Sequence, residues 1–109
     1  MNAIIRTEYQ NTDKRFTKAI DLKFLPREGD DFFIRGMELK GVGGDIDWEG
    51  KVHTVDWHLL PGGQMVPFLT VLMGIFYEDE GEADMMLKYG WIAEKTDHIF
   101  SPPGLAQIK

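Results

Sequence analysis

An aspartate and a histidine that could act together lie in Lys51–Leu60, a segment rich in β-branched and aromatic residues. Asp56 and His58 are two positions apart, so their side chains share one face of a β-strand. A carboxylate that orients an imidazole is one arrangement of a general base. The only hydroxyl nearby on that face is Thr54, and a row along a single strand offers no nucleophile in a pocket. We therefore expect a polar strand surface, and a small enzyme with a site near Asp56 and His58 is our third functional hypothesis.

A second group of oxygen ligands runs through residues 45–56. Acidic residues stand at positions 1, 3 and 5 of this segment, glycine at 6, an aliphatic residue at 8 and a carboxylate at 12. In this the segment resembles the calcium-binding loop of EF-hand proteins. The carboxylates that the resemblance assigns to calcium are Asp45, Asp47, Glu49 and Asp56. Glu49 replaces the usual Asp or Asn, Asp56 is shorter than the usual Glu, and neither flank is predicted to be helical. We therefore expect an exposed acidic connection leading into a strand, with calcium as the alternative.

Other metal and cofactor patterns are incomplete. Of the three histidines, His53 and His58 are five positions apart and fall on opposite faces of a regular strand, while His98 lies in a loop-like region. The glycine-rich residues 41–44 lack the Lys-Ser/Thr pair of a phosphate-binding loop. We expect no metal site and no cofactor.

Composition narrows the class of protein. The 109 residues are 43% hydrophobic and 28% charged, which is typical of one globular domain, and we expect a single domain over 1–109 with an irregular or extended tail at 101–109. The chain has no cysteine, which fits a reducing compartment, so we expect a cytoplasmic protein. The longest apolar run, residues 65–77, is shorter than the roughly 18 residues that a membrane helix needs. We expect no membrane association.

Negative charge is concentrated in the middle of the chain. Residues 41–87 carry nine acidic side chains and one basic one, within a net charge of −6. Such a surface repels phosphate, so we expect no direct nucleic-acid ligand. Our second functional hypothesis is an acidic inhibitor, of the kind found in phages and mobile elements, that presents carboxylates to a basic nucleic-acid-binding protein. The carboxylates of this acidic surface are Asp45, Asp47, Glu49, Glu78, Asp79, Glu80, Glu82 and Asp84.

Alternating apolar residues, turn formers and one amphipathic segment predict the order of the elements. The pattern Leu25-Pro26-x-x-Gly29-Asp30, followed by Val52-x-x-Val55-x-Trp57, resembles SH3-like barrels, which implies a fold but no residue roles. We expect a mainly β (α+β) fold: a small, strongly curved antiparallel sheet or SH3-like barrel with one short helix. The expected elements are a hairpin of strands 3–9 and 15–25, a turn at 26–30, short strands at 31–35 and 37–42, a strand at 51–60, a turn at 61–63, a strand from 65 that Gly74 bends, and a helix near 79–89, capped by Asp79.

The apolar run at residues 65–77 is the basis of the leading functional hypothesis. Both of its faces are apolar, and one short helix cannot cover the outer face. In the alternative, the N-terminal hairpin and the tail residues Ile99, Phe100 and Leu105 cover it within one chain. We expect a non-enzymatic protein–protein interaction module that forms a homodimer or docks on another protein. The expected contact residues are Phe68, Val71, Met73, Phe76, Met86 and Trp91.

Overall fold

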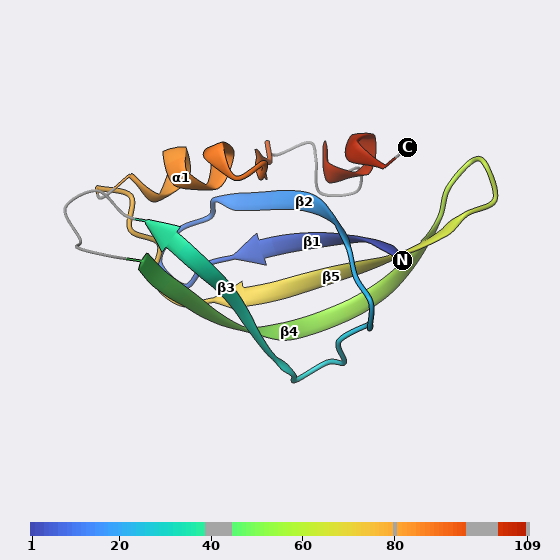
Figure 1. Ribbon diagram of the computed structural model, residues 1–109, viewed down its shortest axis with the longest axis horizontal. Helices are drawn as coiled ribbons and strands as arrows, with labels where there is room; N and C mark the ends of the chain where they lie inside the picture. The colour runs from blue at the N-terminus through green and yellow to red at the C-terminus, as the bar shows by residue number, and fades with distance from the viewer. Residues whose placement is uncertain (39–44, 80, 96–102, 109) are drawn as a thin grey trace.

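A computed structural model describes residues 1–38, 45–79, 81–95 and 103–108, with the backbone alone at 36–38 and 45–47. Its strands form one sheet in the order β3-β4-β5-β1-β2-β6, which curls into a half-barrel (Figure 1). The mainly β fold with one short α-helix is therefore confirmed. The elements in chain order are β1 (Asn2–Glu8), β2 (Arg15–Asp21), β3 (Asp31–Glu38), β4 (Asp45–Leu59), β5 (Met65–Met73), α1 (Glu82–Lys88), β6 (Ile92–Ala93) and the 3-10 helix η2 (Pro103–Gln107).

The two hairpins form where alternation and turn residues place them. β1 and β2 pair antiparallel from Asn2↔Asp21 to Glu8↔Arg15. β4 and β5 pair antiparallel around the turn at residues 61–63, in which Gly63 takes a positive φ of 87° that suits glycine. β3 is a single strand through Gly36, where two shorter pieces were expected, and its pairing with β4 shifts register between Ile34 and Met37. Residues 39–42 lie outside the described part of the chain.

One pairing is not antiparallel. β5 lies beside β1 in parallel, from Ile4↔Phe68 to Glu8↔Leu72, so the sheet is mixed. This places β5 between β4 and β1, in the interior of the sheet. A strand with neighbours on both edges and cover on both faces needs no polar face, which explains why both faces of β5 are apolar.

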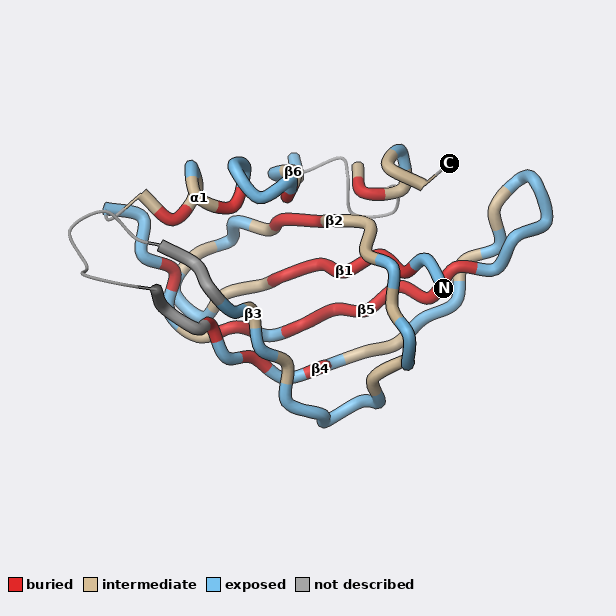
Figure 2. Tube along the Cα trace, viewed as in Figure 1, coloured by how far each residue is buried: buried red, intermediate tan, exposed pale blue. Residues whose placement is uncertain are grey.

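The two faces of the sheet carry separate clusters. The inner face packs against α1, and the outer face packs against η2 through Leu105 and Ile108. Figure 2 shows the buried stretches along β1, β2 and β5. The outer cluster consists of Ile4, Val66 and Phe68. The inner cluster consists of Ala3, Ile5, Phe16, Trp48, Val52, Leu69, Val71, Met73, Phe76, Met86 and Trp91.

The predicted contact surface on the apolar strand is wrong. Its six residues all belong to these clusters, and none exposes more than 4% of its surface. Leu105 takes part in the cover, as the alternative expected, while Ile99 and Phe100 lie outside the described residues. A single chain thus covers β5 on both faces from Val66 to Val71, while Met65 and Leu72 stay exposed. The residues that were expected to form a contact surface and are instead buried are Phe68, Val71, Met73, Phe76, Met86 and Trp91.

Helix α1 begins later than predicted. Gly81, with φ 81°, precedes its first residue, and no side chain caps it, so Asp79 is not the cap. The Gly81 N–H donates to the Glu78 carbonyl at 3.1 Å, which closes a turn before the helix. The predicted end is confirmed, because Gly90 has φ 88° and donates its N–H to Leu87.

The tail is not irregular or extended over residues 103–107, where η2 docks on β2. The Gly104 N–H donates to Thr17 Oγ1 at 3.0 Å, and Gln107 Oε1 accepts the Ala19 N–H at 2.7 Å. β6 pairs only with Phe16 and Thr17 of β2. Gln107 thereby provides a hydrogen-bond partner for the next part of this strand edge, at Ala19. None of the helices in the described part of the chain has the length and apolar character that crossing a membrane requires.

Candidate functional site

Among the described residues, the far half of β4 has a hydrogen-bonded neighbour strand on only one edge. The β3–β4 ladder ends at Asp31↔Lys51. Next to it, Val52 donates its N–H to Asp30 at 2.9 Å and accepts the N–H of Gly29 at 2.7 Å. Beyond Val52, no described residue hydrogen-bonds to the backbone of 54–59 on the edge away from β5. We call this edge of residues 54–59 the free edge.

The free edge belongs to a projecting hairpin. Figure 1 shows the β4–β5 hairpin reaching past the other strands at the right-hand end of the molecule, whose longest dimension is 45 Å. Figure 2 shows that the tip of the hairpin is mostly exposed.

One face of this hairpin is apolar and exposed. Trp57 exposes 51% of its surface, Leu59 69% and Met65 51%. Leu59 is opposite Met65 in the ladder, and Trp57 and Leu59 continue the face on which Val55 packs against the inner cluster. These three exposed residues, which we call the distal strip, extend the inner face beyond its own core.

The opposite face carries Asp56 and His58, as alternation predicts. Asp56 is opposite Phe68 and His58 opposite Val66, with Thr54 on the same face. The His58 ring stacks on Phe68 with centroids 5.1 Å apart and planes inclined by 20°. Packing on an aromatic ring restricts the imidazole to one position beside the strand.

The structure does not bring the side chains of Asp56 and His58 into hydrogen-bonding contact with each other. Among the described residues, no hydrogen bond links the two side chains, and Asp56 is exposed. His53 sits at a register shift between Val52 and Thr54, so the expected placement of His53 and His58 on opposite faces, which assumed regular alternation, does not hold at this bulge. In the described part of the chain, no group of three His, Asp or Glu side chains is suited to a metal ion.

The EF-hand-like segment is a strand. β4 begins at Asp45, where a loop was expected, and continues through Asp56. At about 3.3 Å per residue the ends of this segment are about 36 Å apart, so the four carboxylates cannot surround one ion. The candidate calcium set that this rules out is Asp45, Asp47, Glu49 and Asp56.

Close packing between β4 and β5 explains why residue 50 is a glycine. A Cβ there would lie 2.5 Å from Met73 Sδ and 2.7 Å from the Leu72 carbonyl oxygen. The glycine that resembled a calcium-loop residue therefore lets β4 and β5 approach closely. The Gly in this pattern serves the sheet and gives no evidence of a bound ion.

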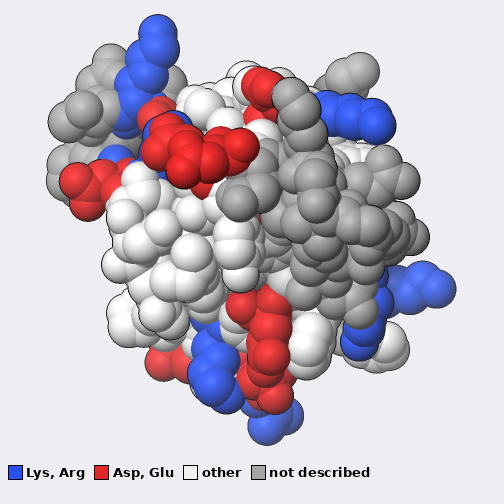
Figure 3. Space-filling view, turned by 90° about the vertical axis from the view of Figure 1, so that its left-hand side faces the viewer, with Lys and Arg blue, Asp and Glu red and all other residues white. Residues whose placement is uncertain are grey.

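The predicted acidic surface is divided. Glu82 is completely buried, Glu78 bonds to Lys14, and Glu49, Asp79 and Asp84 are exposed. Figure 3 shows the Asp and Glu side chains of this end in several separate groups, with Lys and Arg beside them. The side chains at Asp45 and Asp47 and the whole of Glu80 lie outside the described residues.

Glu82 is a buried carboxyl that the sequence analysis placed on the surface. Its Oε1 accepts the Trp48 Nε1–H at 2.6 Å and the Tyr77 N–H at 3.4 Å, while Oε2 has no hydrogen-bond partner among the described groups. Burial raises the pKa of Glu82 to about 7, against the opposing effect of the hydrogen bonds from Trp48, Tyr77 and Tyr9. Burial also raises the pKa of the Tyr9 hydroxyl. An acidic residue in the first turn of a helix is usually exposed, so no local pattern predicts the burial of Glu82.

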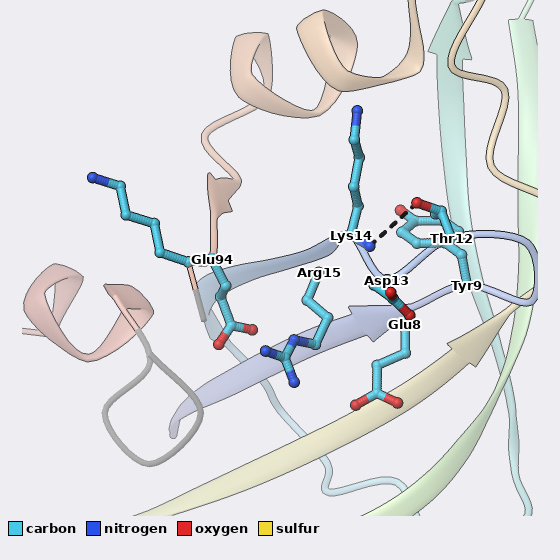
Figure 4. Close-up of a pocket in the computed structure, with 8 residues that line it drawn as sticks. Glu8, Tyr9, Thr12, Asp13, Lys14, Arg15 and Glu94 are labelled. Atoms are coloured by element: carbon cyan, nitrogen blue, oxygen red, sulfur yellow. Dashed lines mark hydrogen bonds between the residues drawn. The ribbon is translucent and has the colours of Figure 1, made fainter. Parts of the chain in front are cut away.

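A polar pocket of about 480 Å³ lies where β1, β2 and the residue after β6 meet (Figure 4). Glu8 and Glu94 line it together with Arg15. Glu94 also accepts two hydrogen bonds from the buried Arg6, Nε–Oε2 at 2.6 Å and Nη2–Oε1 at 2.5 Å. Acidic and basic side chains are equally numerous in its lining, so the pocket favours neither anions nor cations.

Comparison with known proteins gives no match: no protein-family model, no curated protein sequence and no solved structure is similar to this chain. The SH3-like relationship stays a prediction.

Proposed function

We propose that the protein is a non-enzymatic interaction module that binds a second copy of itself through the far half of β4. The observation that supports this most is the distal strip of Trp57, Leu59 and Met65 next to the free edge. Exposed apolar side chains that cluster beside an open strand edge form a surface that gains stability when another chain covers it.

The free edge lacks the features that usually protect such an edge. Proteins commonly guard exposed strands with lysine, proline or inward-pointing charge. Residues 54–59 contain neither lysine nor proline, and Asp56 is their one acidic residue. The bulge at His53 lies between the ladder to β3 and the free edge, so residues 54–59 form a regular strand beyond it.

Binding of a basic protein partner through the acidic groups is the competing proposal. Glu49, Asp79 and Asp84 are exposed and available to such a partner. Binding through these charges would weaken steeply with added salt, whereas an apolar contact would hardly respond. The distal strip favours self-association, and the absence of cysteine suits the cytoplasm as its location.

The test compares two leucines in size-exclusion chromatography with light scattering. Leu59→Ser removes an apolar side chain from the distal strip, and Leu87→Ser removes one from α1, where 51% is exposed. We expect the wild-type chain and Leu87→Ser to form dimers and Leu59→Ser to shift toward monomers. Equal masses for the two variants at every concentration would contradict the proposal.

A further inference from the structure

The sequence of the free edge specifies how two copies would align. We propose that the second copy adds to β4 as an antiparallel strand, with Trp57 of one copy directly opposite Trp57 of the other. This inference rests on the proposed function and adds the register and the contacts that select it.

Two-fold symmetry limits the choice of register. In a symmetric pair of identical antiparallel strands, one residue is opposite itself and its neighbours pair with the residues at equal distance on the other side. Directly opposite residues share a face of the sheet, so the inner face of one copy continues the inner face of the other. The candidates for the axis position are the four interior residues of the free edge: Val55, Asp56, Trp57 and His58.

Charge separates these registers. With Asp56 on the axis, two carboxylates are opposite each other, and with His58 on the axis, two imidazoles are opposite each other. With Val55 on the axis, Trp57 is opposite His53, at the bulge. Like charges directly opposite each other destabilise a cross-strand pair, so the register on Asp56 is disfavoured. The register on His58 places Asp56 opposite the apolar Leu60, where it gains no polar partner, and the register on Val55 needs a regular strand where β4 is irregular.

The register with Trp57 on the axis satisfies both faces. On the outer face, Asp56 of each copy is opposite His58 of the other, which gives two acid–base pairs. On the inner face, Trp57 meets Trp57 and Val55 meets Leu59. Stacking on Phe68 at 5.1 Å holds each His58 beside the edge before association, which reduces the entropy lost when the pairs form.

Cysteine cross-linking tests the register directly, because the chain has no cysteine of its own. In the double variant Val55→Cys/Leu59→Cys, each new cysteine is opposite one in the other copy. Directly opposite residues have Cα atoms about 4.5–5.5 Å apart, within the range that a disulfide spans. We expect this variant to form a covalent dimer on mild oxidation. Trp57 is retained, so its contact is not lost.

The single variant Leu59→Cys is the matched control. In this register the two copies of residue 59 are four positions apart along the strands, about 13 Å, so no disulfide forms. Leu87→Cys reports random collision, because Leu87 is also exposed, at 51% on α1. A covalent dimer through Asp56→Cys with none through Val55→Cys/Leu59→Cys would overturn the register.

A charge exchange provides the second measurement. Asp56→His alone places two histidines opposite two histidines, and His58→Asp alone places carboxylates opposite carboxylates. We expect each single variant to raise the dimer dissociation constant about tenfold and the double variant to restore it. If the dimer exists but the double variant is no tighter than the single variants, the register is wrong and the proposed function stands. If the wild-type chain is monomeric throughout, both fail.

Discussion

The buried carboxyl of Glu82 makes the stability of this protein depend on pH. Its pKa is 4.5 in an unfolded chain and about 7 in the folded protein, so the folded state binds the proton more tightly. The stabilisation from this proton is complete below the unfolded pKa and is lost as the pH rises through the folded pKa. The two pKa values correspond to at most about 3 kcal/mol of unfolding free energy. Most of this loss falls between about pH 5 and about pH 8.

The variant Glu82→Gln removes the titration and keeps the shape. Its side-chain oxygen can still accept the Trp48 Nε1–H, which Glu82 accepts at 2.6 Å. Urea unfolding of both proteins, followed by tryptophan fluorescence at several pH values, gives the free energy of unfolding. We expect the wild-type value to fall relative to that of Glu82→Gln by about 2–3 kcal/mol between about pH 5 and about pH 8. The exposed Glu49→Gln serves as the control and should follow the wild type.

Parallel curves for wild type and Glu82→Gln would refute this reasoning. They would mean that the carboxyl titrates alike in the folded and unfolded states, so that it is hydrated in the folded protein. The unpartnered Oε2 would then have water beside it, and the core around Trp48 would be open.

Three further contacts of the fold are tested by substitution, each by urea unfolding. Glu94→Ala removes the carboxylate that accepts two hydrogen bonds from the buried Arg6, and should lower the free energy of unfolding by about 3 kcal/mol. The double variant Arg6→Met/Glu94→Leu, which leaves no unpaired charge, should lose less; a loss as large as that of Glu94→Ala would contradict this. Gly50→Ala should destabilise by about 1–3 kcal/mol because its Cβ meets Met73 Sδ at 2.5 Å, and an unchanged midpoint would show that β4 and β5 separate without cost. Gln107→Ala should cost about 1 kcal/mol through its two side-chain hydrogen bonds, and no loss would mean that η2 docks through apolar contacts alone.

The sequence pattern predicted those secondary-structure elements that depend on neighbouring residues alone. The hairpin of β1 and β2 follows from alternation and a polar turn, and Gly90 ends α1 because glycine accepts a positive φ. The parallel pairing of β1 with β5 joins strands about 64 positions apart, so no local sequence pattern predicts it. The start of β4 was missed because its acids and glycines suit a loop, while Gly50 is there for its approach to Met73.

The interaction surface was misplaced for a related reason. Hydrophobicity identified β5 as unusually apolar, but whether a strand lies at the edge or in the interior of a sheet depends on long-range pairing. Val55, Trp57 and Leu59 share one parity in the sequence, which predicts an apolar face. That the core covers Val55 and ends before Leu59 is a property of the assembled fold.

Sedimentation equilibrium of the wild-type chain over a wide range of concentration tests self-association most directly. We expect the average mass to rise from that of one chain to that of two and to stop there, because pairing along one edge closes the assembly. A mass equal to one chain at every concentration would contradict the account.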